Sequence, residues 1–428
     1  MKPSWIKNVN LKLTLERKDV LLGLILLLVT AGLYYAQWGY YLTSLPDSKI
    51  NVDFPQKYFW WADDSRDYRM TGDWMFGNSV QTVIDARPWV YPVFVGLSRV
   101  LFGKGAERFL WNSQFLMWLA SGALIYLALY KSTRLVFPGI LGAILFYSLP
   151  SPLILTFHGL TETLNIFLLC VFCWLLAGKK SFPILLLIFV FSLLTATKPT
   201  YQIQLALLVI YALWQAFRLA GKVRIRQIGL IALALIPIWI QLTFSFTYNR
   251  TLSISNIGPQ TFKNYLVAVV YSRVENLEWR PSMQAIENWD TGQELAYLLA
   301  HQRETLLTYR QNLIDNNQWV GSFFIQGKNN RMIGFVETAN AAAVYLHLIM
   351  LPLVLYYLAS SKYKENKTAI ALIYAVFLIQ ILVSGISTGQ EDRLTVTGIP
   401  LWIITYLLVI YYLISHGRTA IAAPTEAG

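Results

Sequence analysis

The chain has 428 residues, of which 56% are hydrophobic and only 14% are charged, and its mean hydropathy is +0.46. This composition lies far outside the range of soluble globular proteins and indicates a protein that crosses a membrane several times. The net charge of +12 is accounted for by lysine and arginine in the expected cytoplasmic loops, so nucleic-acid binding is a poor explanation of it.

A helical span needs about 20 mostly apolar residues, and the chain holds about ten windows of this kind. They lie near residues 20–41, 107–130, 136–155, 160–178, 182–197, 200–217, 228–248, 339–359, 369–387 and 395–415. We therefore expect an all-α polytopic membrane protein that has the lipid bilayer as a partner. The first window is too long and too far from the start for a typical cleaved signal, and we expect it to remain as an anchor.

Lysine and arginine indicate the orientation, because cytoplasmic loops are enriched in them. If the N-terminus is cytoplasmic, the short outside turns carry only Lys198 and Arg393. The short inside loops then carry Lys131 and Arg134, Lys179 and Lys180, Arg218, Lys222, Arg224 and Arg226, and Lys362, Lys364 and Lys367. We expect a multi-pass protein of the plasma (inner) membrane with both termini in the cytoplasm.

Two longer segments are expected on the outer side, at residues 42–106 and 249–338. The second half of the first, from Arg87 to Gly103, is apolar but shorter than a span, so we expect a helix that lies at the outer surface. In the second, apolar or long side chains recur at three- and four-residue steps, which predicts a small helical cap. These are Leu295, Leu298, Leu299, Gln302, Leu306 and Tyr309. The expected parts are thus a module at 1–248 with the first outer loop, an outer helical segment at 249–338 and C-terminal spans at 339–428.

Four short polar breaks in the apolar chain fall on the expected outer side. They are Asp63–Tyr68, His158–Glu162, Thr197–Pro199 and Gln390–Arg393. A charge at membrane depth costs about 2.5 to 3.5 kcal/mol, so ionisable groups are kept there mainly where they pair or act. Four such breaks on one face suggest a site.

Two other sequence features bear on function. Cys170 and Cys173 lie within one expected helix, and we expect two buried, small apolar residues, with no disulfide framework or zinc site. The chain has no Gly-rich phosphate loop of the nucleotide-binding kind, so a soluble sugar-nucleotide donor is poorly supported.

A set of motifs follows in a recognisable order along the first outer segment. They are Asp64-Ser65-Arg66-Asp67-Tyr68, Gly72-Asp73-Trp74, Arg87-Pro88-Trp89-Val90-Tyr91-Pro92 and Phe102-Gly103, and later Ser151-Pro152, Thr161-Glu162-Thr163-Leu164 and Arg393 before Gly398-Ile399-Pro400. This order resembles the GT-C superfamily of integral-membrane glycosyltransferases, in particular its protein O-mannosyltransferase-like and aminoarabinose-transferase-like branch.

The resemblance implies an enzyme that transfers a sugar, with inversion, from a polyprenyl-phosphate donor to a glycan, lipid or protein acceptor on the extracytoplasmic face. A carboxylate after the first helix would take the acceptor's proton, and Asp64 is the expected base, with Asp63 and Asp67 as further catalytic candidates. The family often has Asp-Glu at this point, whereas Asp64 is preceded by Asp63 and followed by Ser65. The equivalent aspartate therefore stays open, although the spacing to Tyr68 favours Asp64.

Fixed cations would stabilise the departing lipid phosphate. The expected donors are Arg87, Lys198, Arg250 and Arg393, with Glu162 and Tyr68 in support. Simpler interpretations exist for several of them: Glu162 as the acidic start of a helix, Lys198 as a side chain that snorkels to the interface, and Arg393 as a partner of its neighbours in sequence. A divalent cation is possible because carboxylates gather here, but relatives of this branch look metal-independent, and no cofactor is firmly implied.

Two other functional classes remain open. A ligase or polymerase of lipid-linked glycans would use similar outer-face cations with a diphosphate leaving group. A lipid or glycan transporter would need a polar path through the bilayer, and the expected spans carry almost no charge at mid-depth.

Overall fold

The computed structural model describes residues 61, 63–178, 182–319, 330–361, 363, 366–387 and 391–421, together with the single positions 25, 29 and 32. The regular elements in these residues are all helices, joined by turns and loops, and the described residues contain no strand. The first expected span, 20–41, lies outside the described residues except at those three positions.

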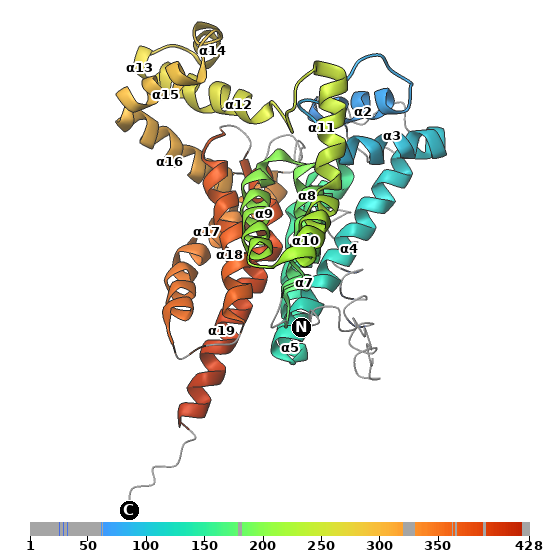
Figure 1. Cartoon of the computed structure of the whole chain (residues 1–428). Helices are drawn as coiled ribbons and strands as arrows, with labels where there is room; N and C mark the ends of the chain where they lie inside the picture. The colour runs from blue at the N-terminus through green and yellow to red at the C-terminus, as the bar shows by residue number, and fades with distance from the viewer. Residues whose placement is uncertain are drawn as a thin grey trace, which may run out of the picture.

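A bundle of apolar helices makes up the body of the molecule (Figure 1). In chain order these helices are α4 (Ala106–Thr133), α5 (Val136–Ser148), α7 (Glu162–Leu176), α8 (Ile184–Thr195), α9 (Gln202–Phe217), α10 (Gly221–Ala234), α11 (Ile236–Asn249), α17 (Asn330–Ala359), α18 (Lys367–Ser384) and α19 (Ile399–Ile421). Between α5 and α7 lie the short α6 (Pro150–Ile154) and a 3-10 turn, η4 (Leu155–Phe157).

Several of these helices are long and apolar enough to cross a membrane, which makes the chain a multi-pass membrane protein. Within the described residues they are Val90–Thr133, Pro199–Phe217, Gly334–Ala359, Lys367–Ser384 and Val396–Ser415. The count rises from five to seven if each of two bent pairs, at 136–157 and 221–249, forms one span.

The difference from the expected ten has two sources. The first expected span lies outside the described residues, and α7 and α8 are apolar helices of only 15 and 12 residues. α7 ends just before Gly178, whose φ of +65° ends a helix readily, and a Cβ there would lie 2.7 Å from the Lys131 carbonyl oxygen. The sequence windows therefore located these two helices but overestimated their length.

The first outer segment forms two helices, α2 (Asp63–Met75) and α3 (Val90–Phe102), which lie across one end of the bundle (Figure 1). α3 is the short helix expected between Arg87 and Gly103. The two helices pack closely because Gly72 and Gly96 face each other: a Cβ on Gly96 would lie 2.6 Å from the Gly72 carbonyl oxygen. A larger residue at either glycine would push α2 and α3 apart.

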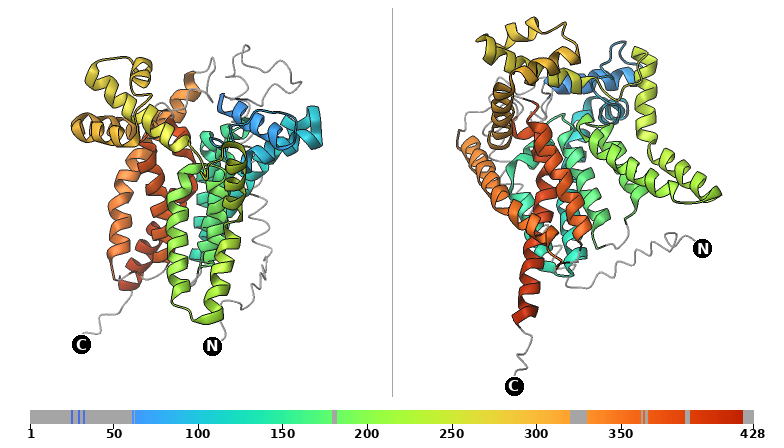
Figure 2. Two further views of the ribbon diagram at one scale, coloured as in Figure 1. Left: turned by 45° about the horizontal axis from the view of Figure 1, so that its top comes forward. Right: turned by 60° about the vertical axis from the view of Figure 1, so that its left-hand side comes forward.

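The second outer segment folds into a small helical cap at the same end of the molecule as α2 and α3 (Figures 1 and 2). Its helices are α12 (Ile257–Thr261), α13 (Ala268–Glu275), α14 (Trp279–Ala285), α15 (Thr291–Ala300) and α16 (Gln302–Gln318), with a π-helical turn, η6 (Phe262–Val267), between α12 and α13. The cap has its own core, which includes Val267, Val270, Ile286 and Leu298. Both long polar segments thus lie at one end, as the distribution of lysine and arginine indicates.

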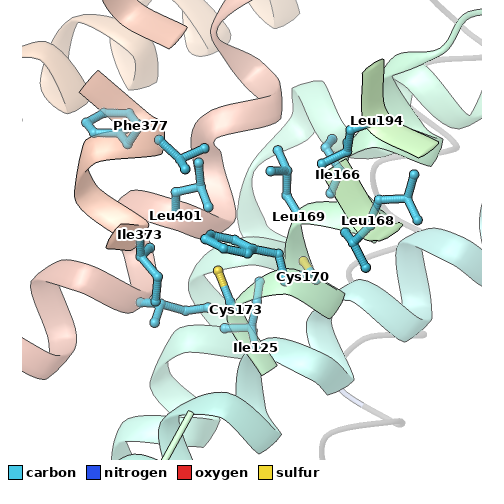
Figure 3. Close-up of a cluster of buried hydrophobic side chains, with 14 of the residues drawn as sticks. Ile125, Ile166, Leu168, Leu169, Cys170, Cys173, Leu194, Ile373, Phe377 and Leu401 are labelled. Carbon is cyan, nitrogen blue, oxygen red and sulfur yellow. The ribbon is translucent and has the colours of Figure 1, made fainter. Parts of the chain in front are cut away.

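The main hydrophobic core lies between α4, α7, α8, α18 and α19 (Figure 3). Cys170 and Cys173 of α7 are free thiols within this core, near Ile125 of α4 and Ile373 of α18. Their burial confirms the interpretation of the pair as small apolar residues.

Candidate functional site

All four polar breaks contribute to one network of ion pairs at the end of the bundle that carries α2 and α3. Arg393 donates through Nε to Glu162 Oε1 at 2.7 Å, and Lys198 Nζ lies 3.2 Å from the same oxygen. Arg393 also pairs with Asp64 through Nη1. Arg87 binds the other oxygen of Asp64, with 2.7 Å between Nη2 and Oδ1.

A second carboxylate of α2 completes the network. Arg87 donates through Nε to Asp67 Oδ2 at 3.1 Å. We call the six residues the charged cluster: Asp64, Asp67, Arg87, Glu162, Lys198 and Arg393. The cluster therefore sets three cations against three carboxylates.

Burial increases steadily across the charged cluster. The Glu162 side chain is fully buried and that of Arg393 is 8% exposed, whereas the Asp64 side chain is 32% exposed. Asp67 is open to a similar degree. A ligand arriving from outside would therefore meet Asp64 and Asp67 first and the Glu162–Arg393 pair last.

Each member of the charged cluster stands at or near the end of a helix. Asp64 and Asp67 are three residues apart on the first turns of α2 and share one face. Glu162 is the first residue of α7. Lys198 has extended backbone, φ −141° and ψ 114°, which is the conformation that the following Pro199 favours.

Arg393 lies in a 3-10 turn, η7 (Glu391–Leu394), between α18 and α19. A second turn, η8 (Val396–Gly398), leads into α19. The connection between these helices therefore brings a guanidinium to the same place as the start of α7, 231 residues away in sequence.

Aromatic rings support the outer half of the charged cluster. The guanidinium of Arg87 lies 5.4 Å from the ring centre of Tyr68, which is buried. Tyr68 in turn contacts Tyr91 edge to face, with 5.1 Å between ring centres. The Tyr68 ring thus packs against the Arg87 guanidinium.

Gln114 of α4 fixes the turn that leads to Glu162. It is fully buried, accepts a hydrogen bond from the Tyr91 hydroxyl at 2.8 Å, and donates to the carbonyl oxygens of Thr156 and His158 at 2.9 Å. The sequence analysis did not identify Gln114. A lone glutamine in an apolar helix was the available signal, because a buried amide needs partners.

Gln241 of α11 fixes the segment that carries Arg87 through hydrogen bonds of its side-chain amide. Its amide accepts from the Trp89 backbone N–H at 3.0 Å and donates to the carbonyl oxygens of Ile84 and Ile254, also at 3.0 Å. The backbone on both sides of Arg87 is therefore tied to α11, and this residue too was missed from sequence.

The cap holds the connection that carries Arg393. Asn316 of α16 donates to the carbonyl oxygens of Ser384 at 2.7 Å and Ser387 at 2.6 Å, and Asn312 donates to Gly385 O at 3.0 Å. Thr395, two residues after Arg393, donates back to Asn316 O at 2.9 Å. The outer cap thus helps to position the most deeply buried cation of the charged cluster.

The ionisation of Asp64 reflects two opposing effects. Burial raises the pKa of Asp64, but the charges of Arg393 and Arg87 lower it by more, so the pKa lies below its usual range. Burial lowers the pKa of Lys198, and Glu162 only partly offsets this effect. Asp64 is therefore a carboxylate with little affinity for a proton as long as both arginines hold it.

One carboxylate oxygen in the charged cluster has spare capacity. Glu162 Oε2 is buried and accepts no hydrogen bond from any described residue. A buried acceptor without a donor costs about 1 to 3 kcal/mol, more when it is charged. This oxygen can take a hydrogen bond from a hydroxyl or a water molecule.

Two of the expected site residues are not seen in the charged cluster. Arg250 ends α11 in a left-handed conformation, φ 58°, and is exposed; its guanidinium lies 5.8 Å from the Phe246 ring and forms no ion pair with a described residue. Arg250 therefore lies apart from Arg87, Lys198 and Arg393, which are the expected cations that the structure brings together. The side chain of Asp63 lies outside the described part of the chain, as do those of Glu391 and Asp392.

Metal ligands are a separate question. In the described residues, no group of three or more His, Cys, Asp or Glu side chains is arranged to hold a metal ion.

Comparison of the chain with protein-family models, with curated proteins and with solved structures found no match. The chemistry of the site must therefore be argued from its own residues.

Proposed function

We propose that this chain is a glycosyltransferase that moves a sugar, with inversion, from a polyprenyl-phosphate donor to a glycan, lipid or protein acceptor on the extracytoplasmic side of the membrane. The observation that carries the proposal is the charged cluster. Four breaks, separated by up to 329 residues, meet at the end of an apolar bundle in a network open at Asp64 and buried at Glu162.

The cations suit the phosphate of a lipid-linked donor. Arg87 and Arg393 present planar guanidinium groups, which match phosphate oxygens in pairs, and Lys198 adds a third positive charge. As the bond to the sugar breaks, negative charge grows on the phosphate, and fixed cations in a partly buried site stabilise it. Glu162, fully buried, acts as a positioning residue that holds Arg393 and Lys198.

Asp64 is the proposed general base. It takes the proton of the acceptor hydroxyl while the hydroxyl oxygen forms a bond to the anomeric carbon, and the carbon–oxygen bond to the phosphate breaks with its electron pair on the phosphate. A single displacement of this kind inverts the anomeric centre. The exposure of the Asp64 side chain, 32%, allows an acceptor to reach it.

In the unliganded arrangement, the two arginines keep Asp64 ionised but weakly basic. A bound donor phosphate competes for the same guanidinium groups, because its oxygens match their paired N–H groups and its single negative charge becomes two as the bond to the sugar breaks. As Arg393 and Arg87 turn to the phosphate, the pKa of Asp64 rises, because its neighbouring positive charge is shared. Donor binding would thus activate the base.

The topology belongs to the same proposal. About ten spans, with both termini in the cytoplasm, place the charged cluster and the cap on the outer side of the plasma (inner) membrane. The five to seven spans of the described residues and the common end of α2, α3 and the cap support this arrangement.

The donor class provides the test. Purified protein in nanodiscs is incubated separately with a polyprenyl-phosphate sugar and a polyprenyl-diphosphate sugar, each with a panel of glycan, lipid and protein acceptors. We expect sugar transfer with the monophosphate only. Transfer with the diphosphate alone would indicate a ligase or polymerase, and inactivity with both would favour transport.

A further inference from the structure

Helix α16 has an unusual distribution of side chains. Its buried face is polar: Thr308, Asn312 and Asn316 follow one another at four-residue steps, and each is at most 2% exposed. The hydrogen bonds of Asn312 and Asn316 to the connection after α18 explain this burial. Any apolar surface of α16 must therefore lie on the opposite face of the helix.

That opposite face carries leucines and arginines. Arg303, Leu306, Leu307 and Arg310 have the spacing i, i+3, i+4 and i+7, which places them on one side of the helix. Leu306 is 68% exposed. Neither arginine forms an ion pair with a residue that the structure describes.

The preceding helix carries two more exposed leucines. On α15, Leu295 and Leu299 share a face and are exposed, whereas Leu298 lies in the core of the cap. The two helices meet at a tight corner, where Thr305 Oγ1 donates to Leu298 O at 3.1 Å. We call the four exposed residues the leucine stripe: Leu295, Leu299, Leu306 and Leu307.

The position of the corner indicates what covers the leucine stripe. α15 and α16 extend sideways beyond α17 in Figure 1 and in the left view of Figure 2, and α16 packs against α17. α17 is a candidate span with an exposed apolar surface that includes Tyr345, Leu348 and Ile349. The leucine stripe therefore lies beside a surface that faces lipid.

We infer that α15 and α16 rest on the outer leaflet of the bilayer, with the leucine stripe at the boundary between headgroups and acyl chains. Leucines that insert to this depth, flanked by arginines, are the pattern of helices that lie in the interface. Arg303 and Arg310, which form no ion pair with a described residue, reach lipid phosphates.

The contact has a consequence for the charged cluster. α16 lies on lipid with one face and holds the connection before Arg393 with the other, through Asn312 and Asn316. The bilayer surface would thus fix the height of Arg393 relative to lipid headgroups. The inference itself concerns the membrane and does not depend on the proposed reaction.

The test places a fluorophore on the leucine stripe. Leu306→Cys is labelled with an environment-sensitive dye in nanodiscs of phosphatidylcholine and phosphatidylglycerol. The native Cys170 and Cys173 are fully buried, and wild-type protein treated with the same dye checks that they do not react. The matched control is Gln284→Cys, an exposed position on α14, which lies at the far tip of the cap (Figure 1).

We expect nitroxide lipids labelled near the headgroup to quench the dye at position 306 but not the dye at position 284. Iodide, which stays in the water, should quench the dye at position 306 at least about threefold less than the dye at position 284, as for an interfacial helix. Equal iodide quenching at both positions would overturn the inference. So would protection from iodide without quenching by lipid, which would indicate a second copy of the chain or another protein. Leu307→Cys repeats the measurement if Leu306→Cys folds poorly.

Discussion

Asp64 is held between two guanidinium groups, and its properties follow from this position. Arg87 and Arg393 each bind one of its oxygens. The sequence predicted a carboxylate near the expected membrane surface, but it could not show that Arg87 and Arg393 both pair with Asp64. The arrangement makes the resting carboxylate stable and poorly reactive, which is the state an enzyme would need in the absence of donor.

Acid stability reports on these ion pairs. Since the pKa of Asp64 is lowered from its ordinary value of 3.8, the unfolded chain binds more protons than the folded one as pH falls through this range. The stabilisation from Asp64 is therefore complete above about pH 4 and is lost towards lower pH. We expect the melting temperature of the wild type to fall more steeply between pH 5 and pH 2 than the melting temperature of Asp64→Asn. Parallel profiles would show that the ion pairs of Asp64 do not persist in solution.

Two arginines on the expected outer side provide a matched pair of variants. Arg393→Gln removes a buried cation that holds both Glu162 and Asp64, so donor binding and turnover should both fall, by about 10-fold or more. Arg250→Gln removes an exposed arginine outside the charged cluster and should leave the kinetics near those of the wild type. The KM for donor and kcat of each variant give the comparison. A larger loss for Arg250→Gln would restore the assignment made from sequence.

At the level of elements, α16 connects the cap to the site. Asn316→Ala removes two hydrogen bonds to the connection before Arg393, at a cost of about 1 to 3 kcal/mol; Ser384 O keeps the hydrogen bond from Ser387 N, whereas Ser387 O loses the donor that Asn316 supplies. We expect a lower melting temperature and a raised KM for donor. Asn317→Ala is the control, because among the described residues Asn317 bonds within α16, to Leu313 O at 2.7 Å. Equal effects of the two changes would argue against a clamp on the connection.

The elements also show what sequence patterns can and cannot predict. The four polar breaks were found because a charge in an apolar chain is conspicuous, and the distribution of lysine and arginine placed them on one side. The side chains that position them were not found, since Gln114 binds carbonyl groups more than 40 residues away in sequence and Gln241 binds Ile84 O, 157 residues away. Helix ends at α7 and α8 were also misjudged, because apolar windows do not report where a glycine or proline stops a helix.

For the molecule as a whole, the topology is the claim that everything else requires. A protease-cleavable reporter at Asp290, in the cap, and another at Lys222, at the turn between α9 and α10, should lie on opposite sides of the membrane. Accessibility to protease added outside intact cells or right-side-out vesicles measures this. If both reporters were cleaved from the same side, the proposed orientation and the extracytoplasmic site would be wrong together.

The most direct test of the charged cluster as a catalytic centre is the rate of sugar transfer from a polyprenyl-phosphate donor by Asp64→Asn protein. The substitution keeps the shape of the side chain but removes the proton acceptor, so turnover should fall by about 100-fold or more, while donor binding should not weaken, because the neutral amide competes less for Arg87 and Arg393. Asp63→Asn, measured in the same nanodiscs, serves as the control and should retain activity. Normal turnover by Asp64→Asn together with loss in Asp63→Asn would move the base by one residue, and full activity of both variants would contradict the catalytic role of the cluster.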